Sequence, residues 1–277
     1  MQKNKVSAVL NHGDMPPDYW CETGGLRLRA KVWNEDRQGL PIVFLNGVGT
    51  SLEIAAPLAR QFTGRRFIAI EMPGSGLTAN TSVPLPPPLL ARFAAEAARQ
   101  LGAPRFDLVG LSIGGALAQQ VAWQYRDRVA RLVLAGTCSG ITMMPHDWMH
   151  DGLIWTMNPF AVLLSDLMSD LLGPHLHQLV HPTPASIASQ FASFAGWSSL
   201  AFLPMIRTPA LVLAGARDRI IPPSNAAQLS AFLPNSDYRV LPDAAHLFPF
   251  SEPERTARHI MRFFEKTPSA PAGAERR

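Results

Sequence analysis

The sequence predicts an α/β fold in which a mostly parallel central sheet is flanked by helices and interrupted by a helical insertion. Three observations carry this prediction. Short apolar runs alternate with helix-length segments, turn residues separate them, and a serine between glycines joins an apolar run to a helical one at residues 110–114. With 277 residues, of which 47% are hydrophobic, the chain is long enough to bury a full core.

The expected elements begin with a hairpin, because residues 18–22 and 26–32 flank a Gly24-Gly25 turn. The strands expected after it cover residues 41–45, 66–70, 106–110, 131–135, 210–214 and 237–241. The expected helices cover residues 52–62, 88–101, 113–125, 223–232 and 253–264. Since strands alternate with helices, the strands are expected to run parallel.

The alternation breaks between about residues 140 and 204, in a stretch rich in Met, Trp, Leu and Pro. This stretch is interpreted as a helical cap. The predicted organisation is a discontinuous core over residues 17–140 and 205–266, a cap over 141–204, and flexible tails over 1–16 and 267–277.

Composition excludes several classes of function. The net charge is only +4 and the arginines are scattered rather than clustered, so no nucleic-acid partner is expected. No apolar run approaches the roughly 20 residues of a membrane span, and residues 1–14 lack the apolar core of a secretion signal, so a cytoplasmic location is expected. Cys21 and Cys138 are far apart in sequence and predict neither a disulfide framework nor a metal site.

The most informative stretch runs from Gly110 through Ser112 to Gly114. It follows an apolar strand-like run and precedes a helical one. Gly-x-Ser-x-Gly in this context is the nucleophile elbow of α/β-hydrolases, in which a sharp turn presents the serine hydroxyl above the sheet. Glycines two residues before and after the serine are required because a Cβ would clash there. Ser112 is therefore the predicted nucleophile.

An acid and a histidine follow in the order that this fold requires. Asp218 comes on a turn behind the apolar run 211–214, and His246 comes after the last expected strand. In this scheme Ser112 attacks, His246 takes and later returns the proton, and Asp218 holds the histidine tautomer.

Alternatives remain for each of these residues. Asp218 as a helix cap and His246 as a structural histidine are the plain interpretations. Asp243 is the rival acid, although it lies on the same turn as His246 and fits better as an organiser of that turn. A weak histidine cluster at His175, His177 and His181 has no nearby carboxylate or cysteine, so no metal and no other cofactor is predicted.

The oxyanion hole is expected from the loop after the strand at residues 41–45. Its glycines Gly47 and Gly49 let the backbone turn N–H groups toward a substrate oxygen. The predicted donors are the backbone amides of Val48 and Ile113. Asn46 stands where relatives carry histidine; its alternative interpretation is a simple Asn-Gly turn.

With these residues placed, the chain resembles the intracellular poly(3-hydroxyalkanoate) depolymerases of the medium-chain-length type, which are α/β-hydrolases. The similar pieces are residues 44–49, 112–120, 131–137, 196–199, 211–215 and 246–248. The narrower signals are Asn-Gly-Val-Gly, the double glutamine and Gly-Trp-Ser-Ser. The chain departs from that pattern at Ile113, where relatives tend to carry an aromatic residue, and its insertion is shorter.

The resemblance implies a serine ester hydrolase that acts through an acyl-enzyme on poly(3-hydroxyalkanoate) or its oligomers, with storage granules as a further expected contact. Apolar residues of the insertion, from Met143 to Phe160, suit a flexible aliphatic ligand, or they pack the cap onto the core. Two alternatives of function stay open besides a general carboxylesterase. One is carbon–carbon bond hydrolysis of a diketone-type substrate, and the other is a non-catalytic granule-binding protein.

Overall fold

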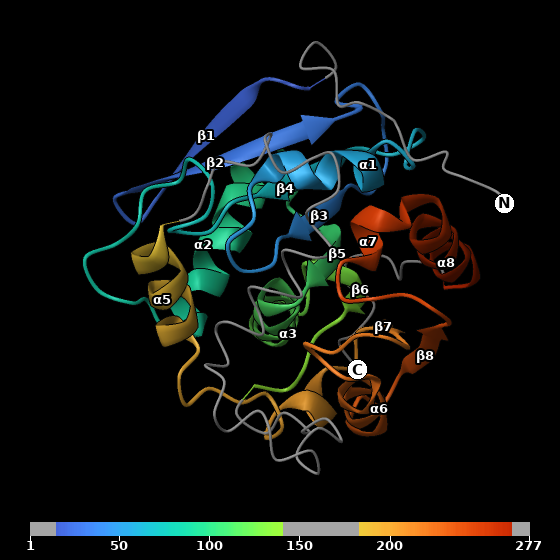
Figure 1. Ribbon diagram of the computed structural model, residues 1–277. Helices are drawn as coiled ribbons and strands as arrows, with labels where there is room; N and C mark the ends of the chain where they lie inside the picture. Colours follow the sequence, from blue (N-terminus) through green and yellow to red (C-terminus); the bar gives the residue numbers. More distant parts are fainter. Residues whose placement is uncertain (1–14, 141–182, 268–277) are drawn as a thin grey trace, which may run out of the picture.

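A single twisted sheet forms the centre of the molecule (Figure 1). The computed structural model describes residues 15–140 and 183–267. The strands lie in the order β1-β2-β4-β3-β5-β6-β7-β8. Their bounds are β1 (Asp18–Thr23), β2 (Leu26–Trp33), β3 (Ile42–Leu45), β4 (Phe67–Ile70), β5 (Phe106–Leu111), β6 (Val129–Ala135), β7 (Ala210–Gly215) and β8 (Ser236–Leu241).

The sheet is antiparallel at one edge and parallel elsewhere. β1 pairs with β2 and β2 with β4 in antiparallel fashion, whereas every pair from β4 to β8 is parallel. In a parallel sheet all carboxyl ends meet at one edge. The segments that follow β3, β5, β6, β7 and β8 therefore gather there, and all of the predicted site residues belong to them.

Helices cover both faces of the sheet. Apolar side chains of α2 (Pro87–Gln100), α3 (Ile113–Gln124) and α6 (Pro223–Phe232) pack on one face. Those of α1 (Ala56–Ala59) and α8 (Pro253–Lys266) pack on the other, beside the short α7 (Phe248–Ser251). Successive residues of β3 point alternately into the apolar core on one face and on the other, as expected for a strand buried on both faces. The predicted α/β fold with flanking helices is confirmed.

One element differs from its prediction. The helix expected over residues 52–62 is a 3₁₀ turn, η2 (Leu52–Ala55), followed by a single α-helical turn that ends at Ala59. The backbone then tightens, because Gln61 and Phe62 donate to carbonyls three residues earlier. At the other end, the Leu52 N–H donates to the buried Glu71 carboxylate, so a tertiary contact organises this segment.

Most of the predicted cap, residues 141–182, and most of the predicted tails, residues 1–14 and 268–277, lie outside the described residues. Of the predicted cap, the structure describes α5 (Pro184–Ser193) and the 3₁₀ turn η6 (Leu203–Met205). Figure 1 draws α5 on the side of the molecule where α2 lies. The division into core and cap stays a prediction.

Candidate active site

The turn between β5 and α3 holds Ser112 in a backbone conformation that non-glycine residues rarely adopt, with φ 55° and ψ −124°. The Ser112 N–H donates to the Ala135 carbonyl at 3.0 Å, and the Ser112 carbonyl accepts from the Thr137 hydroxyl at 2.7 Å. Such a strained serine persists only where its surroundings enforce it, and it is typical of a functional site.

The glycines around Ser112 are required by close packing. A Cβ on Gly110 would collide with the Gly114 carbonyl oxygen and with the Ala118 side chain. A Cβ on Gly114 would collide with the carbonyl oxygens of Leu45 and Asn46. The start of α3 thus lies directly against the end of β3. This packing is the physical basis of the Gly-x-Ser-x-Gly pattern in this chain.

Asp218 and His246 form a buried hydrogen-bonded pair. Asp218 Oδ2 lies 2.8 Å from His246 Nδ1, and the two side chains are 0% and 4% exposed. The other carboxylate oxygen, Oδ1, accepts from the N–H groups of Ile220 at 3.0 Å and Ile221 at 2.8 Å. Because an ionised carboxylate only accepts hydrogen bonds, a neutral His246 carries its proton on Nδ1, which leaves Nε2 free to act as a base.

Asp243, the rival acid, lies in a different environment. It forms an ion pair with Arg217 on the surface, where the two side chains are 73% and 71% exposed. Its φ of 64° lies in the left-handed region that Asp tolerates in turns. The geometry therefore favours Asp218 over Asp243 as the partner of His246.

Gly136, directly after β6, links the serine turn to the Asp-His pair. A Cβ on Gly136 would lie 3.4 Å from both Asp218 Oδ2 and His246 Nδ1. The residue before it, Ala135, accepts the hydrogen bond from Ser112 N–H. The segments that carry the three predicted residues thus meet around one point at the carboxyl edge of the sheet. Their assignment as a catalytic triad stays a prediction.

The loop after β3 packs against the same point. A Cβ on Gly47 would lie 3.4 Å from the Ser112 Cβ, so the loop backbone borders the serine. Asn46 Nδ2 donates to the Ser51 carbonyl at 2.9 Å, and the Thr50 hydroxyl donates to the Gly47 carbonyl at 2.8 Å. Asn46 therefore braces the whole loop rather than only a local turn. The donor roles of the Val48 and Ile113 amides stay predictions.

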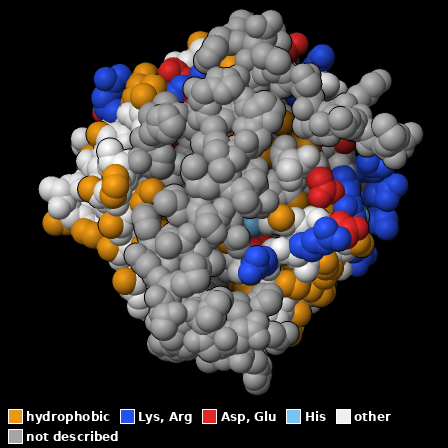
Figure 2. Space-filling model, in the orientation of Figure 1, with side chains coloured by type: hydrophobic (Ala, Val, Ile, Leu, Met, Phe, Trp, Pro, Cys, Tyr) orange, Lys and Arg blue, Asp and Glu red, His pale blue; other side chains and the backbone are white. Residues whose placement is uncertain are grey.

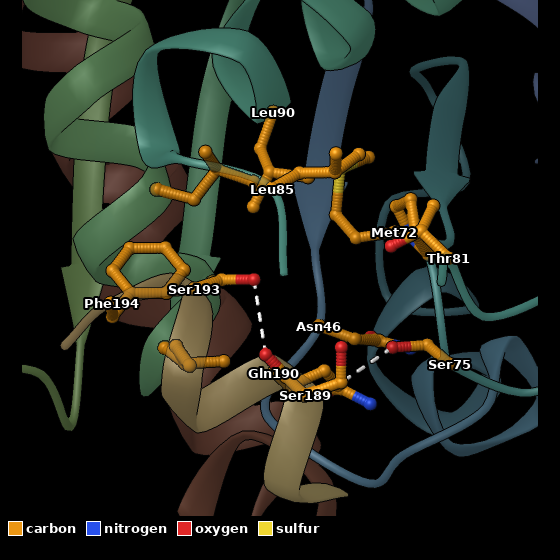
Figure 3. A pocket seen from close by; sticks show the side chains of 14 residues that line it. Asn46, Met72, Ser75, Thr81, Leu85, Leu90, Ser189, Gln190, Ser193 and Phe194 are labelled. Atoms are coloured by element: carbon orange, nitrogen blue, oxygen red, sulfur yellow. Dashed lines mark hydrogen bonds between the residues drawn. The ribbon is translucent and has the colours of Figure 1, made fainter. Parts of the chain in front are cut away.

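A pocket opens beside this loop and Ile113 (Figure 3). Apolar side chains from several elements meet polar side chains of Ser75, Thr81 and the α5 residues Ser189, Gln190 and Ser193. The apolar side chains that line it are those of Met72, Pro73, Leu85, Leu90, Ile113, Leu117 and Phe194. It encloses about 510 Å³, part of which is open to solvent. Among the residues that the structure describes, fourteen line it, and all of these are uncharged.

A buried charged cluster lies behind the loop. Glu71 is fully buried and accepts from the Leu52 N–H at 3.2 Å, from Leu77 and Thr78 N–H groups at 3.1 Å, and from Arg29 Nη1 at 3.3 Å. Burial raises the pKa of Glu71 to about 7, although Arg29 and the backbone N–H groups of Leu52 and Thr78 act to lower it. This carboxyl ties the segment after the loop to a pocket wall.

Sequence reasoning missed Glu71 and Gln190. A single signal marked Glu71: an acid directly after the apolar strand β4, followed by Pro73 and two glycines. Nothing near Gln190 in the sequence pointed to it, because its partners lie 115 to 141 residues away.

The predicted absence of a metal site is tested only in part. Within residues 15–140 and 183–267, no group of three or more His, Cys, Asp or Glu side chains is arranged to hold a metal ion. The weak cluster of His175, His177 and His181 lies outside the described residues, as do the apolar residues from Met143 to Phe160. Cys21 and Cys138 are free thiols. In the part of the chain that the structure covers, no helix is both long and apolar enough to span a bilayer.

Comparison with known families decides the membership of the chain. The family model described as "Alpha/beta hydrolase family" matches residues 42–259. The chain belongs to the α/β hydrolase family. This match spans the serine turn, Asp218 and His246, and the fold that the sequence predicted is the fold of that family.

Among named relatives of this α/β hydrolase is a poly(3-hydroxyalkanoate) depolymerase of Ectopseudomonas oleovorans. It is 30% identical over 243 residues, which cover 82% of this chain and 84% of the relative. A 2-hydroxy-6-oxononadienedioate/2-hydroxy-6-oxononatrienedioate hydrolase of Burkholderia vietnamiensis is 28% identical. The match covers 87% of this chain and 93% of that hydrolase.

Among solved structures, a thermophilic esterase from Thermogutta terrifontis superposes with a TM-score of 0.75 at 23% identity. The match covers 91% of this chain and 99% of the esterase. At this level of identity the likeness supports the fold alone.

Proposed function

We propose that this α/β hydrolase is a serine ester hydrolase that cleaves poly(3-hydroxyalkanoate) or its oligomers through an acyl-enzyme. The observation that carries the proposal is the buried Asp218–His246 pair together with a strained Ser112, whose neighbour Ile113 lines a largely apolar pocket. The likeness to a depolymerase supports the choice of substrate.

In the proposed reaction His246 Nε2 accepts the hydroxyl proton while Ser112 Oγ attacks the ester carbonyl carbon. The carbonyl oxygen becomes an oxyanion, which the amides of Val48 and Ile113 stabilise. The bond to the alcohol oxygen then breaks, His246 returns the proton to that oxygen, and the acyl group stays on Ser112. A water molecule repeats the sequence and releases the acid.

The pocket supports an aliphatic ester over the alternative carbon–carbon substrate. The name of the Burkholderia vietnamiensis relative describes a dicarboxylate substrate. Burying a carboxylate without a cation is costly, and the pocket residues that belong to the described ranges, 15–140 and 183–267, are all uncharged. A polyester of hydroxyacids carries no charge along its length and alternates apolar side groups with ester oxygens. The mixture of Leu, Met and Phe with Ser and Thr in the pocket suits that pattern.

The surroundings of the pocket support an insoluble or polymeric substrate. Leu77, Val83 and Phe191 are 51%, 61% and 41% exposed, and each lies within two residues of one that lines the pocket. Figure 2 shows hydrophobic side chains gathered on the left side of the molecule, where Figure 1 places α5. Exposed apolar side chains near a site lower the cost of contact with an apolar surface.

A substrate panel tests the proposal. The turnover of p-nitrophenyl esters from acetate to dodecanoate is compared with acid release from 3-hydroxyoctanoate and 3-hydroxybutyrate polymers and with cleavage of a diketone. Each buried methylene is worth up to about 0.8 kcal/mol, so kcat/KM should rise from two to about eight carbons and then level off. Release of 3-hydroxyoctanoate is expected.

Three results would reject the substrate or the activity. A maximum at acetate with no polymer hydrolysis points to a general carboxylesterase, and faster cleavage of the diketone points to carbon–carbon chemistry. Failure of a fluorophosphonate probe to label Ser112, together with retained binding to polyester granules, supports a non-catalytic binding protein.

A further inference from the structure

Gln190, in the second half of α5, connects three segments that are far apart in sequence. Its side chain is buried, with the residue only 8% exposed. Its amide oxygen Oε1 accepts from the Gly49 N–H at 3.3 Å and from the Ser75 hydroxyl at 3.4 Å. Its amide nitrogen Nε2 donates to the Gly74 carbonyl at 2.8 Å. Figure 3 shows this amide at the wall of the pocket, facing Ser75.

The bond to Gly49 bears on the loop that borders Ser112. Gly49 directly follows Val48, and its φ of 69° is one that few residues other than glycine adopt. A hydrogen bond at the Gly49 N–H fixes the plane of the Val48–Gly49 peptide. Fixing that plane restricts the backbone torsions of Val48 and hence the direction of its own N–H. Two further hydrogen bonds of the loop, from the side chains of Asn46 and Thr50, close on the loop itself.

We propose that Gln190 is a positioning residue that aligns the Val48 amide for the oxyanion of the transition state. The inference rests on the proposed ester hydrolysis. Gln190 lines the pocket and also accepts a hydrogen bond from the loop, so one side chain links the pocket wall to the loop that carries the oxyanion donor. Because an oxyanion donor acts in the transition state and not on the bound substrate, the effect belongs to kcat rather than to KM.

A purely structural role would be to fasten α5 to the core. Other residues of α5 also attach the helix to the core. Ile187 and Ser186 are buried, and a Cβ on Gly74 would lie 3.4 Å from the Ser186 Cβ. The two roles differ in what they affect. Loosening α5 opens the pocket and raises KM, whereas misalignment of the loop lowers the rate at which the serine reacts with any acylating or phosphonylating agent.

The test compares Gln190→Met, which keeps the side-chain length and removes its hydrogen bonds, with Gln61→Met as the matched control. The Gln61 side chain donates to the Pro57 carbonyl one turn earlier. For Gln190→Met we expect kcat to fall about 10- to 100-fold, less than the about 10²- to 10³-fold that loss of a whole oxyanion donor costs. KM should change less than about threefold, and the rate of fluorophosphonate labelling of Ser112 should fall by the same factor as kcat. Gln61→Met should change neither.

Gln190→Glu provides the second variant. In this buried, uncharged setting the new carboxyl is held in its neutral form, which accepts from Gly49 and Ser75 through one oxygen and donates to the Gly74 carbonyl through the other, so its kcat should lie between those of the wild type and Gln190→Met. Three results would overturn the inference: unchanged kcat in Gln190→Met, a loss confined to KM, or equal losses in the Met and Glu variants. The labelling assay needs no polyester. A wild type that is labelled but does not hydrolyse the polymer therefore rejects the proposed substrate and leaves the test of Gln190 intact.

Discussion

Replacing Asp218 by asparagine tests the site most directly, because the structure fixes how the new amide must lie. Asp218 Oδ1 accepts from two backbone N–H groups, at 3.0 Å from Ile220 and 2.8 Å from Ile221. An asparagine that turned its NH₂ toward them would leave buried donors unsatisfied, at a cost of about 1–3 kcal/mol each. Its carbonyl oxygen therefore stays at the Oδ1 position, and the NH₂ faces His246 Nδ1 in place of Oδ2.

This orientation changes the tautomer of the neutral His246 ring. Nδ1 must then accept a hydrogen bond, so the proton of the neutral ring moves to Nε2, which can no longer take a proton from Ser112. We expect kcat to fall about 10⁴-fold, equivalent to about 5.5 kcal/mol in the barrier. The free energy of unfolding should change by only about 1 kcal/mol, because the two bonds from backbone N–H groups are retained and the third is replaced by a bond from the new NH₂ to Nδ1.

The assay is the kcat of p-nitrophenyl octanoate hydrolysis, with urea unfolding of each variant. Asp243→Asn is the matched control, because its side chain is 73% exposed and its ion pair with the exposed Arg217 is worth at most about 1 kcal/mol. Its kcat should stay within about twofold of wild type. If Asp243→Asn is the more damaging variant, the acid is wrongly assigned. If Asp218→Asn keeps more than a tenth of the activity, the argument from amide orientation fails.

Three further predictions concern the same molecule. Ser112→Ala and His246→Ala should each abolish ester hydrolysis, and the double variant should be little worse than either, because the residues act as a unit; additive losses in kcat would contradict this. For Glu71, burial raises the pKa in the folded protein to about 7, above its ordinary value of 4.5, so wild-type stability should fall as pH rises from about 4.5 to about 7. Urea unfolding of Glu71→Gln at several pH values should lack this dependence, which amounts to at most about 3 kcal/mol, and identical profiles would refute it. Asp107→Ala should lower the free energy of unfolding by about 3–5 kcal/mol, since Arg131 and Arg65 both pair with this buried carboxylate, while kcat of the folded fraction stays unchanged.

Much of the fold was predictable because its signals are local. The strands lie in short apolar runs, and α6 (Pro223–Phe232) begins and ends where the pattern predicted. The sharp turn at Ser112 needs glycines within two residues on each side, so its requirement is also written locally. The order of acid and histidine along the chain then follows from the fold, since parallel strands bring their carboxyl ends to one edge.

What the sequence could not predict depends on contacts between distant segments. The segment 52–62 has helical periodicity, yet it forms a 3₁₀ turn and one α-helical turn, and the distant Glu71 carboxylate holds its first N–H, at Leu52. Gln190 has no distinctive neighbours in the sequence. Its hydrogen bonds form only when the fold brings α5 against residues 49 and 74. The short α7 after His246 was likewise missed, because four residues are too few for a periodic signal.

The two halves of the candidate site are held in physically different ways, and this should affect how each tolerates substitution. Ser112 is fixed by the backbone: its carbonyl accepts from the N–H groups of Gly115 at 2.8 Å and Ala116 at 3.1 Å, and its φ of 55° is enforced by the close packing of Gly110 and Gly114. Any side chain at these glycines would collide with neighbouring atoms, most of them in the backbone, so substitutions there should disrupt folding and activity together.

The loop that carries Val48, by contrast, is held by side chains, two of which come from elsewhere in the chain. Gln190 bonds the Gly49 N–H, and Glu71 bonds the Leu52 N–H just beyond the loop. Each side chain can be replaced by one of similar shape, so the position of the oxyanion donor can shift by small steps while the serine stays where it is. Graded changes in rate should therefore come from substitutions at Gln190 and Glu71, and all-or-none changes from the glycines around Ser112.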